Sequence, residues 1–328
     1  MSYDAWNRRQ FIRTMAAAGA LTSIGRAGHA AVPETIRIVI GYAPGGASDA
    51  LIRVLAAGLA RRNKWVVVPE NKPGAGGLLS MQATKIAPAD GSVLLSTSAA
   101  SIIQSLSAAN RVRLDRDFAP VIISLRGYFT LFSNASVPVT SLKELIAFDK
   151  ANPGKLSYAS FGVGSQLHLA MELLKQKTGM TITHVPYKSS SESMASVLKN
   201  ETQISFTPYS GIRQHIEAGR LRALAVSSKA PSEFAPGVPS MQQAGLDDYE
   251  VAFWFGLNAP AGTPEATLEL LNKELNVVLR EPATQTVIRE QFGAQTLGGS
   301  REDFARVIAT ETKMYDDLIR TANIRLEG

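Results

Sequence analysis

Two glycine-containing loops hold the residues of this 328-residue chain best placed to bind a ligand. Each follows a β-rich run and precedes a helical pattern, so backbone N–H groups and the positive end of a helix dipole face outward. Such a site binds an anion without a charged side chain. The first loop offers Gly45, Gly46 and Ala47, and the second offers Gly162, Gly164, Ser165 and Gln166. Facing each other across a cleft, they would hold a small carboxylate or one carboxylate each of a diacid; the alternative is two ordinary turns.

Side chains near these loops extend the candidate site. Asp49 either caps a helix or orients loop N–H groups. His168 and Glu172 are four residues apart and can pair, which favours a structural histidine over a ligand contact. Lys188 either attracts an anion or is solvated. The remaining expected ligand-binding residues are Tyr42, Ser48, Thr97, Tyr187, Ser189 and Thr207.

The catalytic and cofactor-binding motifs that this sequence resembles are each incomplete. The segment 74–77 lacks the Gly-Lys-Ser/Thr ending of a phosphate-binding loop, and Leu167 stands where a dinucleotide-binding loop needs its third glycine. The chain has no cysteine, which excludes thiol catalysis, Cys-ligated zinc and disulfides. We therefore expect no enzyme, no cofactor and no metal. The rival hypothesis is an exported hydrolase or lyase that uses Ser48 or Ser165 with His168.

Strands that alternate with helices position these loops, which indicates an α/β fold. Strands are predicted at 36–40, 66–68 and 93–97 and, in a second such region, at 156–160, 181–186, 204–207, 223–227 and 251–257. Ser141 and Glu144 form a capping box, and Thr263 is expected to cap a helix with Pro264 at its first position.

Two lobes account for this order of elements. Lobe 1 is expected to comprise 31–128 and 256–328, and lobe 2 to comprise 129–255, with crossovers at 123–133 and 251–259. Trp254 and Phe255 in the second crossover are expected to pack in the core or hinge. Ligands of such folds bind at the carboxyl ends of strands and between lobes.

Residues 1–30 have the layout of a cleavable export signal. Arg8 and Arg9, with Phe11 two residues later, resemble a twin-arginine signal, and Ala30 precedes the expected cleavage site. Removing this segment takes away four arginines and one aspartate and lowers the net charge from +6 to +3. The remaining basic run, 61–64, falls at a predicted helix end, where cations are favoured. Nucleic acid is therefore not expected as a partner.

An ordered set of motifs resembles the substrate-binding (Bug) family of tripartite tricarboxylate transporters across the chain after residue 30. These motifs are YAPGGASD at 42–49, ENKPGAGG at 70–77, APADG at 87–91, DFAPV at 117–121, YAS at 158–160, HVPYK at 184–188 and APAGTP at 259–264. The resemblance implies a two-lobed, flytrap-like (type II) periplasmic binding fold that closes on a small organic acid. It also implies a monomer that delivers the acid to membrane permease subunits.

The resemblance places the ligand between the loops at 42–49 and 162–168, with the loop of Tyr187 and Lys188 as a third wall. This chain departs from the family pattern there: Ser189 and Ser190 stand where the family usually has two glycines. The change restricts the loop backbone and adds hydroxyl donors. The identity of the acid stays open, as does a role in presenting it to a membrane sensor kinase rather than in transport.

Overall fold

A computed structural model describes residues 32–107 and 111–326 of the chain. The expected export-signal residues Arg8, Arg9, Phe11 and Ala30 lie outside these described residues. Within them, no helix is long and apolar enough to cross a membrane, and no cluster of histidine and acidic side chains has the composition of a metal site.

The first sheet has six strands in the order β11-β4-β10-β3-β1-β2. Its central strand β1 (Thr35–Ile40) pairs in parallel with β2 (Val66–Asn71) and β3 (Val93–Ser98). The long strands β4 (Phe118–Tyr128) and β10 (Ala252–Pro260) run antiparallel to each other, and β11 (Gln295–Thr296) pairs with β4. The sheet is therefore mixed rather than purely parallel, as α/β sheets with added antiparallel strands often are.

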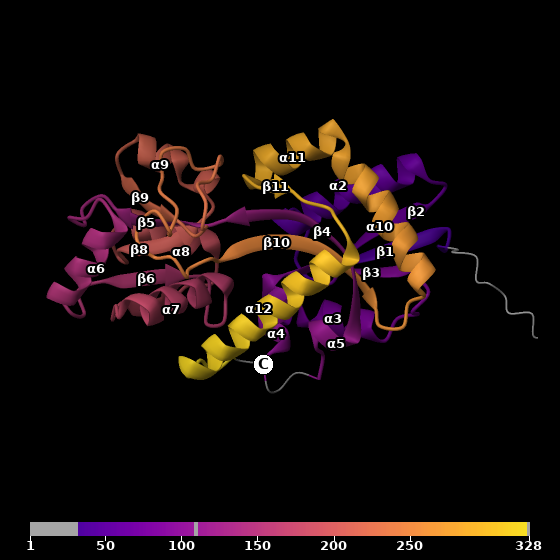
Figure 1. Ribbon diagram of the computed structural model, residues 1–328, viewed down its shortest axis with the longest axis horizontal. Coiled ribbons are helices and arrows are strands. Elements are labelled where there is room, and N and C mark those ends of the chain that lie inside the picture. The colour runs from indigo at the N-terminus through magenta and orange to yellow at the C-terminus, as the bar shows by residue number, and fades with distance from the viewer. Residues whose placement is uncertain (1–31, 108–110, 327–328) are drawn as a thin grey trace, which may run out of the picture. The chain divides into compact units, whose positions relative to one another are not determined.

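Helices from both ends of the described chain accompany this sheet (Figure 1). They are α2 (Ala47–Arg62), α3 (Leu78–Lys85), α4 (Ala99–Ser105), α5 (Leu114–Asp117), α10 (Glu265–Arg280), α11 (Pro282–Phe292) and α12 (Arg301–Thr321), with a 3-10 turn at Ala75–Gly77. Leucines of α2 and α10 pack with the isoleucines of β1 in one buried cluster. The C-terminal helices thus complete the core that the N-terminal strands begin.

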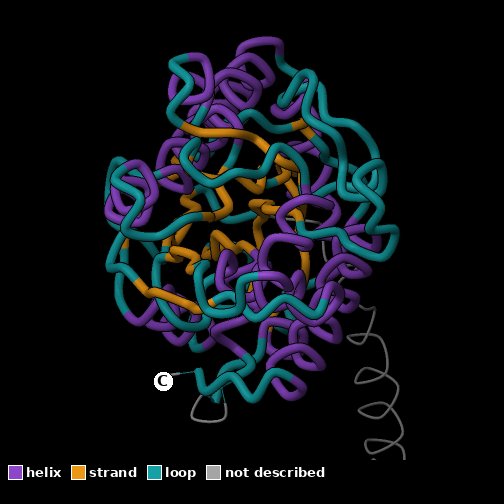
Figure 2. The backbone as a smooth tube through the Cα atoms, turned by 90° about the vertical axis from the view of Figure 1, so that its left-hand side faces the viewer, coloured by secondary structure: helices purple, strands orange, loops and turns teal. Residues whose placement is uncertain are grey.

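The second sheet has five strands in the order β7-β6-β8-β5-β9. These are β5 (Thr130–Asn134), β6 (Ser157–Ser160), β7 (Thr183–Pro186), β8 (Ile204–Thr207) and β9 (Leu221–Val226). Their helices are α6 (Leu142–Ala151), α7 (Gln166–Thr178), α8 (Ser190–Leu198) and α9 (Arg213–Glu217), with a 3-10 turn at Tyr209–Gly211. This sheet has buried clusters of its own. Figure 2 shows the strands of the fold inside, with helices and loops around them.

The chain passes between the sheets twice, at neighbouring points. β4 continues through Phe129 into β5, and the return path enters β10 at Ala252. Ser227 joins the two passages, because its hydroxyl accepts from the N–H of Phe129 at 2.9 Å and donates to the carbonyl of Val251 at 2.6 Å. Both crossings are thereby held at one place.

Two predicted helix starts differ in the structure. Pro264 is the residue before α10 rather than its first residue, and the Thr263 hydroxyl donates to the carbonyl of Pro260 at 2.8 Å, so Thr263 does not cap the helix. Ser141 accepts from the N–H of Glu144 as expected, but the Glu144 carboxylate accepts from the N–H of Thr140 rather than that of Ser141. A competing local acceptor or donor decides each case.

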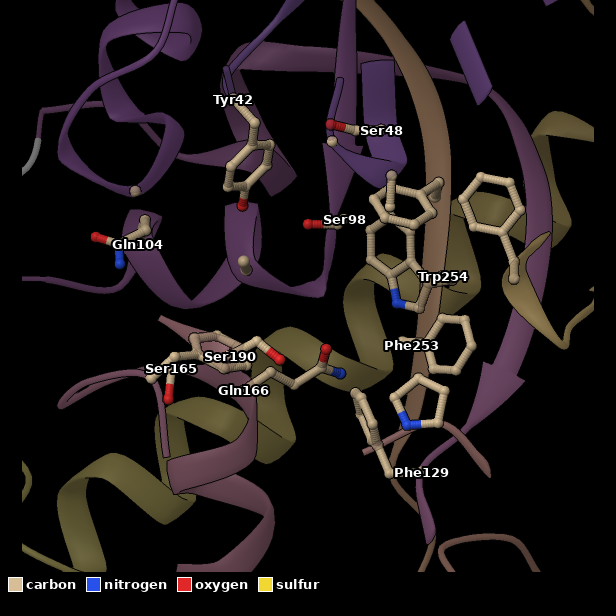
Figure 3. A pocket seen from close by; sticks show the side chains of 18 of the residues that line it. Tyr42, Ser48, Ser98, Gln104, Phe129, Ser165, Gln166, Ser190, Phe253 and Trp254 are labelled. Atoms are coloured by element: carbon tan, nitrogen blue, oxygen red, sulfur yellow. The ribbon is translucent and has the colours of Figure 1, made fainter. Parts of the chain in front are cut away.

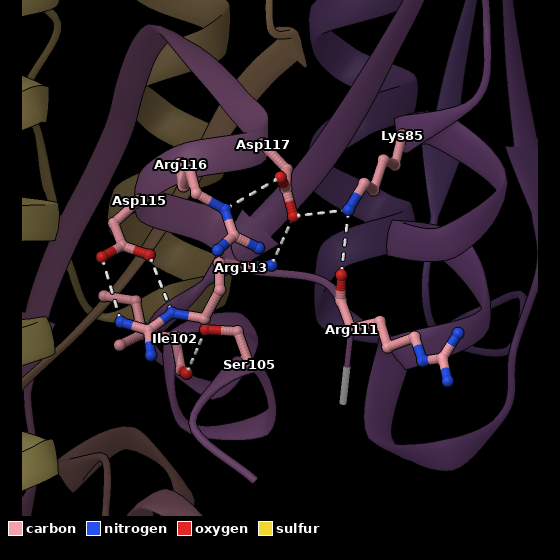
Figure 4. Close-up of polar contacts among 8 residues, drawn as sticks. All are labelled: Lys85, Ile102, Ser105, Arg111, Arg113, Asp115, Arg116 and Asp117. Atoms are coloured by element: carbon pink, nitrogen blue, oxygen red, sulfur yellow. Dashed lines mark hydrogen bonds and ion pairs between the residues drawn. The ribbon is translucent and has the colours of Figure 1, made fainter. Parts of the chain in front are cut away.

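Basic residues of the first sheet's helices are held by carboxylates. Arg61 and Arg62, from the basic run at the end of α2, lie 2.7 Å and 3.4 Å from carboxylate oxygens of Glu281 and Glu274. Asp117 accepts from Lys85 at 3.0 Å and from the N–H of Arg113 at 2.8 Å, which fastens α3 to the start of β4 (Figure 4). These basic side chains are thus paired with carboxylates or carbonyl groups of the fold.

Candidate ligand-binding site

A cavity of about 650 Å³ lies between loops of the two sheets (Figure 3). Its walls combine the ends of α2 and α7 with the strand β10 and the end of α11. The polar or backbone-presenting residues that line it are Tyr42, Gly46, Ala47, Ser48, Gly76, Ser98, Gln104, Gly164, Ser165, Gln166, Ser190, Ser210 and Gln291. The apolar ones are Ala100, Phe129, Phe161, Val163, Pro208, Phe253, Trp254, Phe255 and Phe292.

The first loop is fastened by an ionised carboxylate. Asp49, on the first turn of α2, accepts from the N–H of Gly45 at 3.0 Å, from Arg53 Nε at 2.9 Å and from Asn71 Nδ2 at 3.0 Å. The hydrogen bonds from Arg53 and Gly45 lower the pKa of Asp49 to about 2. Gly45 has a φ of 82°, in the left-handed region that favours glycine. Asp49 therefore stabilises the conformation of the loop and does not itself line the cavity.

The start of α2 presents backbone donors to the cavity. Gly46 precedes the helix without a side-chain capping bond, and the next two residues, Ala47 and Ser48, also line the cavity. The first N–H groups of a helix have no partner within the helix. An anion in the cavity would therefore meet N–H groups and the positive end of the helix dipole.

The second loop repeats this arrangement with a different side chain. The N–H of Gly164 donates to Nδ1 of His168 at 3.1 Å, again four residues on and again on the first turn of a helix, α7. Ser165 precedes α7 and accepts from the N–H of His168, and Gln166 begins the helix. Gly164, like Gly45, has a positive φ, of 75°. Both loops thus aim a helix start at the same cavity.

A buried stack of rings holds His168 in place. Its ring centroid lies 4.1 Å from that of His184, which lies 4.7 Å from that of Tyr158. The Tyr158 hydroxyl donates to Glu172 at 2.6 Å, and Lys175 pairs with the same carboxylate. Burial lowers the pKa of both histidines, that of His184 to about 4, so both are neutral at pH 7. Neutrality matters because Nδ1 of His168 must stay an acceptor for Gly164.

The serine–histidine arrangements do not form an accessible nucleophile. Ser165 accepts from the backbone of His168, whose Nδ1 is occupied by Gly164. Ser160 Oγ lies 2.7 Å from His184 Nε2, but Ser160 is fully buried. A nucleophile activated by a base must also reach its substrate, and Ser160 does not.

The structure brings together part of the predicted set. Tyr42, Gly46, Ala47, Ser48, Gly164, Ser165 and Gln166 line the cavity. Gly45, Asp49, Gly162 and His168 belong to the same two loops but do not line the cavity, and Asp49 and His168 are buried. Tyr42 also contacts Ser98 through its hydroxyl, and burial raises the pKa of that phenol. Backbone donors and uncharged side chains, rather than charges, form the polar surface of the cavity.

Thr97 and Thr207 are each one position away from a residue that lines the cavity. Ser98 lines it, whereas the neighbouring Thr97 points into the core and donates to Asn258 Oδ1 at 2.7 Å. Neighbouring side chains of a strand point to opposite faces, so a position chosen at a strand end is easily shifted by one. Similarly, Pro208 lines the cavity and Thr207 does not.

The expected third wall contributes one residue. Ser190 lines the cavity, whereas Tyr187, Lys188 and Ser189 do not. Ser189 accepts from the N–H of Glu192 as the N-cap of α8, and Lys188 is exposed to solvent. The serine that replaces a glycine here therefore acts as a helix cap.

The sequence analysis did not assign to the site the aromatic wall, which is formed by Phe129, Phe253, Trp254, Phe255 and Phe292. Trp254 does pack in the core, as expected, with its indole N–H donating to Glu311 at 2.8 Å, but it and Phe255 also line the cavity. Phe129 and Phe253 were not predicted to line the site. They could have been found from their positions, because each lies at one of the two chain crossings, where cavities between lobes form. Phe292, the last residue of α11, gives no local signal.

The groups that line the cavity are electrically neutral. Among the residues that the structure describes, none that lines it carries a formal charge. Glu311 lies behind Trp254, and burial raises its pKa to about 7. A ligand charge would therefore be met by backbone N–H groups, hydroxyls and amides.

Comparison with known proteins identifies the family. The model of the tripartite tricarboxylate transporter family receptor matches residues 51–324. The chain belongs to this receptor family. It is 32% identical to the protein BugT of Bordetella pertussis over 295 residues, which cover 89% of this chain and 90% of that protein.

Solved structures of the receptor family share the fold. One, from R. palustris and described with adipate, is 30% identical, with a TM-score of 0.74 over 88% of this chain and 97% of that one. The periplasmic binding protein BugD is 27% identical, with a TM-score of 0.72 over 88% and 98% of the two chains. The expected α/β periplasmic-binding-protein fold is confirmed, and family and fold are those of substrate-binding proteins rather than enzymes.

Proposed function

We propose that this protein captures a small organic carboxylate in the cavity and delivers it to the membrane subunits of a tripartite tricarboxylate transporter. The observation that carries the proposal is that two helix starts, those of α2 and α7, open into one cavity whose described lining is uncharged. Helix N-termini bind carboxylates through backbone N–H groups and the dipole. The family, and a relative described with adipate, support the same class of ligand.

The proposal includes closure of two lobes around the acid. Lobe 1 would comprise 31–128 with 256–328, and lobe 2 would comprise 129–255, so that the crossings near Phe129 and Val251 act as the hinge. The bonds of Ser227 to both crossings support a hinge at this place. A shared hinge lets the two loops approach each other without a change in either sheet.

The first experiment measures thermal unfolding of the purified chain 31–328 with mono-, di- and tricarboxylates and aromatic acids. A ligand at a hundred times its dissociation constant adds about 2.7 kcal/mol to the free energy of unfolding. A rise in melting temperature with at least one organic acid is expected. No rise with any acid, in a chain that unfolds cooperatively, would contradict the proposal.

The second experiment removes one backbone donor. Ala47→Pro deletes the N–H of the first residue of α2, where proline fits a helix, and Gly46 has a φ of −78° and a ψ of 173°, which a following proline accepts. The loss of one hydrogen bond to a charged ligand, worth about 1.5–3 kcal/mol, should weaken binding roughly 10- to 100-fold. Ala47→Val keeps the N–H and is the matched control.

We further propose that residues 1–30 direct export and are then removed, so that the receptor acts as a monomer in the periplasm. The family of periplasmic binding proteins supports this location. N-terminal sequencing of the protein from a periplasmic extract should give Ala31 or its neighbour as the first residue. Replacing Arg8 and Arg9 by lysine should retain the protein in the cytoplasm.

A further inference from the structure

Aromatic side chains gather on one side of the cavity. Figure 3 shows Tyr42, Gln104 and Ser165 toward one side and Phe253, Trp254 and Phe129 toward the other. The helix starts that would bind a carboxylate lie next to this aromatic group: Ser48 of α2 lies on the side of Trp254 in Figure 3, and Gln166 of α7 donates its amide to the carbonyl of Ala252, the residue before Phe253. A ligand held there by its carboxylate therefore has its body against the aromatic side.

The aromatic rings are fixed by their packing. Phe129 and Phe253 lie with centroids 5.3 Å apart at an interplanar angle of 52°, and Phe255 and Phe292 lie 6.2 Å apart at 69°. The Phe253 ring lies against Gly127, where a Cβ atom would come within 2.2 Å of it. These tilted and edge-on pairs leave rings in contact with the cavity, and aromatic pairs of such geometry are favourable beyond the area that they bury.

Apolar side chains of the second loop face the same space. Phe161 is 41% exposed and Val163 is 47% exposed, although both line the cavity. Large apolar side chains with this much exposure on both flanks of Gly162 would be covered by an apolar ligand body. An acid with a purely polar body would leave them in water.

A second carboxylate would have no charged partner on the aromatic side. Ser210 and Gln291 are the polar side chains that line the cavity together with Phe292, and both are neutral. Burial of an ionised carboxylate without a compensating charge or a full set of donors is unfavourable by several kcal/mol. A hydroxyl or amide substituent, in contrast, would find partners there.

We infer that the ligand of this receptor is an aromatic monocarboxylate. Its carboxylate binds the starts of α2 and α7, and its ring lies against Phe253, Phe255 and Phe292. The inference rests on the proposed function and specifies its substrate class. It predicts that the two features of the ligand, one charge and one ring, contribute separately to affinity.

Three acids separate these contributions by isothermal titration calorimetry of the chain 31–328. Hexanoate and adipate have the same number of carbons and differ by the second carboxylate, so adipate should bind at least 10-fold more weakly. 3-Phenylpropionate adds the ring to one carboxylate and should bind about 5- to 10-fold more tightly than hexanoate. Adipate binding as tightly as hexanoate would overturn the inference, as would hexanoate binding as tightly as phenylpropionate.

A variant tests the wall itself. Phe255→Leu keeps an apolar side chain and removes the ring, so phenylpropionate affinity should fall about 5-fold while hexanoate affinity is unchanged. Phe148→Leu, on α6 and outside the cavity, is the matched control and should change neither. Thermal unfolding without ligand checks that both variants fold. An unchanged affinity ratio of the two acids in Phe255→Leu would overturn the inference.

The outcomes distinguish the two proposals. Strong binding of citrate, malate or adipate, with no binding of phenylpropionate, would leave the carboxylate receptor intact and overturn the aromatic assignment. No binding of any of these acids, by a chain that unfolds cooperatively, would contradict the proposed function itself.

Discussion

The two glycine loops at the cavity have the same backbone hydrogen-bond pattern and differ in the side chain that accepts the hydrogen bond. In each, a glycine of positive φ donates its N–H to a side chain four residues on, Asp49 in one loop and His168 in the other. The first acceptor is an ionised carboxylate in a network with Arg53. The second is a neutral imidazole in a buried stack with His184.

The same donor geometry can therefore depend on pH or be independent of it, according to its acceptor. Asp49 keeps its charge down to about pH 2, since hydrogen bonds lower its pKa. A histidine accepts through Nδ1 only while that nitrogen is unprotonated. The first loop is therefore expected to hold its shape in mild acid, where the second begins to lose its acceptor.

The largest effect is expected for Asp49→Ala. The substitution removes the charged acceptor shared by the N–H of Gly45, the amide of Asn71 and the guanidinium of Arg53, so the free energy of unfolding should fall by about 3 kcal/mol. Chemical denaturation measures it. Arg53→Ala, which removes a half-exposed partner, should cost much less; equal losses in the two variants would show that the ion pair, not the loop, matters.

The next effect concerns Glu311, whose contribution to the pH dependence of stability has the opposite sign to that of the histidines. Burial raises its pKa to about 7, so the folded state binds more protons than the unfolded state between about pH 4.5 and 7, and stability falls as pH rises through that range. Glu311→Gln keeps an acceptor for Trp254 and should raise stability by about 2–3 kcal/mol at pH 8, with little change at pH 4.5. A gain independent of pH would contradict this assignment.

The second loop is tested directly by His168→Phe. Phenylalanine keeps the ring stack but removes the acceptor for Gly164, so stability should fall by about 1–2 kcal/mol. Ligand affinity should fall as well, because Gly164 and Ser165 line the cavity. His168→Asn offers a nearby acceptor and should recover part of the affinity; identical behaviour of the two variants would argue against the acceptor role.

The smallest effect is the pH dependence of the second loop, measured in the Glu311→Gln background. The pKa of His184 is lowered to about 4, below its unfolded value of about 6.5, so the unfolded state binds more protons in between. Stability should therefore fall as pH drops from about 6.5 to 4, by about 1 kcal/mol for a partly exposed ring. His184→Phe should flatten the profile in this window, whereas Arg53→Ala should leave it unchanged.

The sequence predicted the fold and the two loops because their signals are local. Glycines after β-rich runs predicted Gly45 and Gly164 as turns, and helical periodicity located α2 and α7 to within a residue or two. The prediction of single positions was less accurate where neighbouring residues can take the same place at a strand end or a helix start. Ser98 rather than Thr97 lines the cavity, and Pro264 rather than Thr263 precedes α10, because pleat direction and local hydrogen bonds shift these positions by one.

The sequence predicted the strands and helices around the two loops, the family resemblance and the backbone donors, since each depends on residues close together in the chain. It did not predict the strands β4 and β5, which lie where a crossover was expected. What those donors face depends on how distant parts of the chain pack together. The aromatic wall joins Phe129, Phe253 and Phe292 across more than 160 positions, and the stack of His184 on His168 joins two helix-and-strand units. Contacts of this kind follow from how sheets and helices pack, and packing is set by the whole core rather than by any one segment.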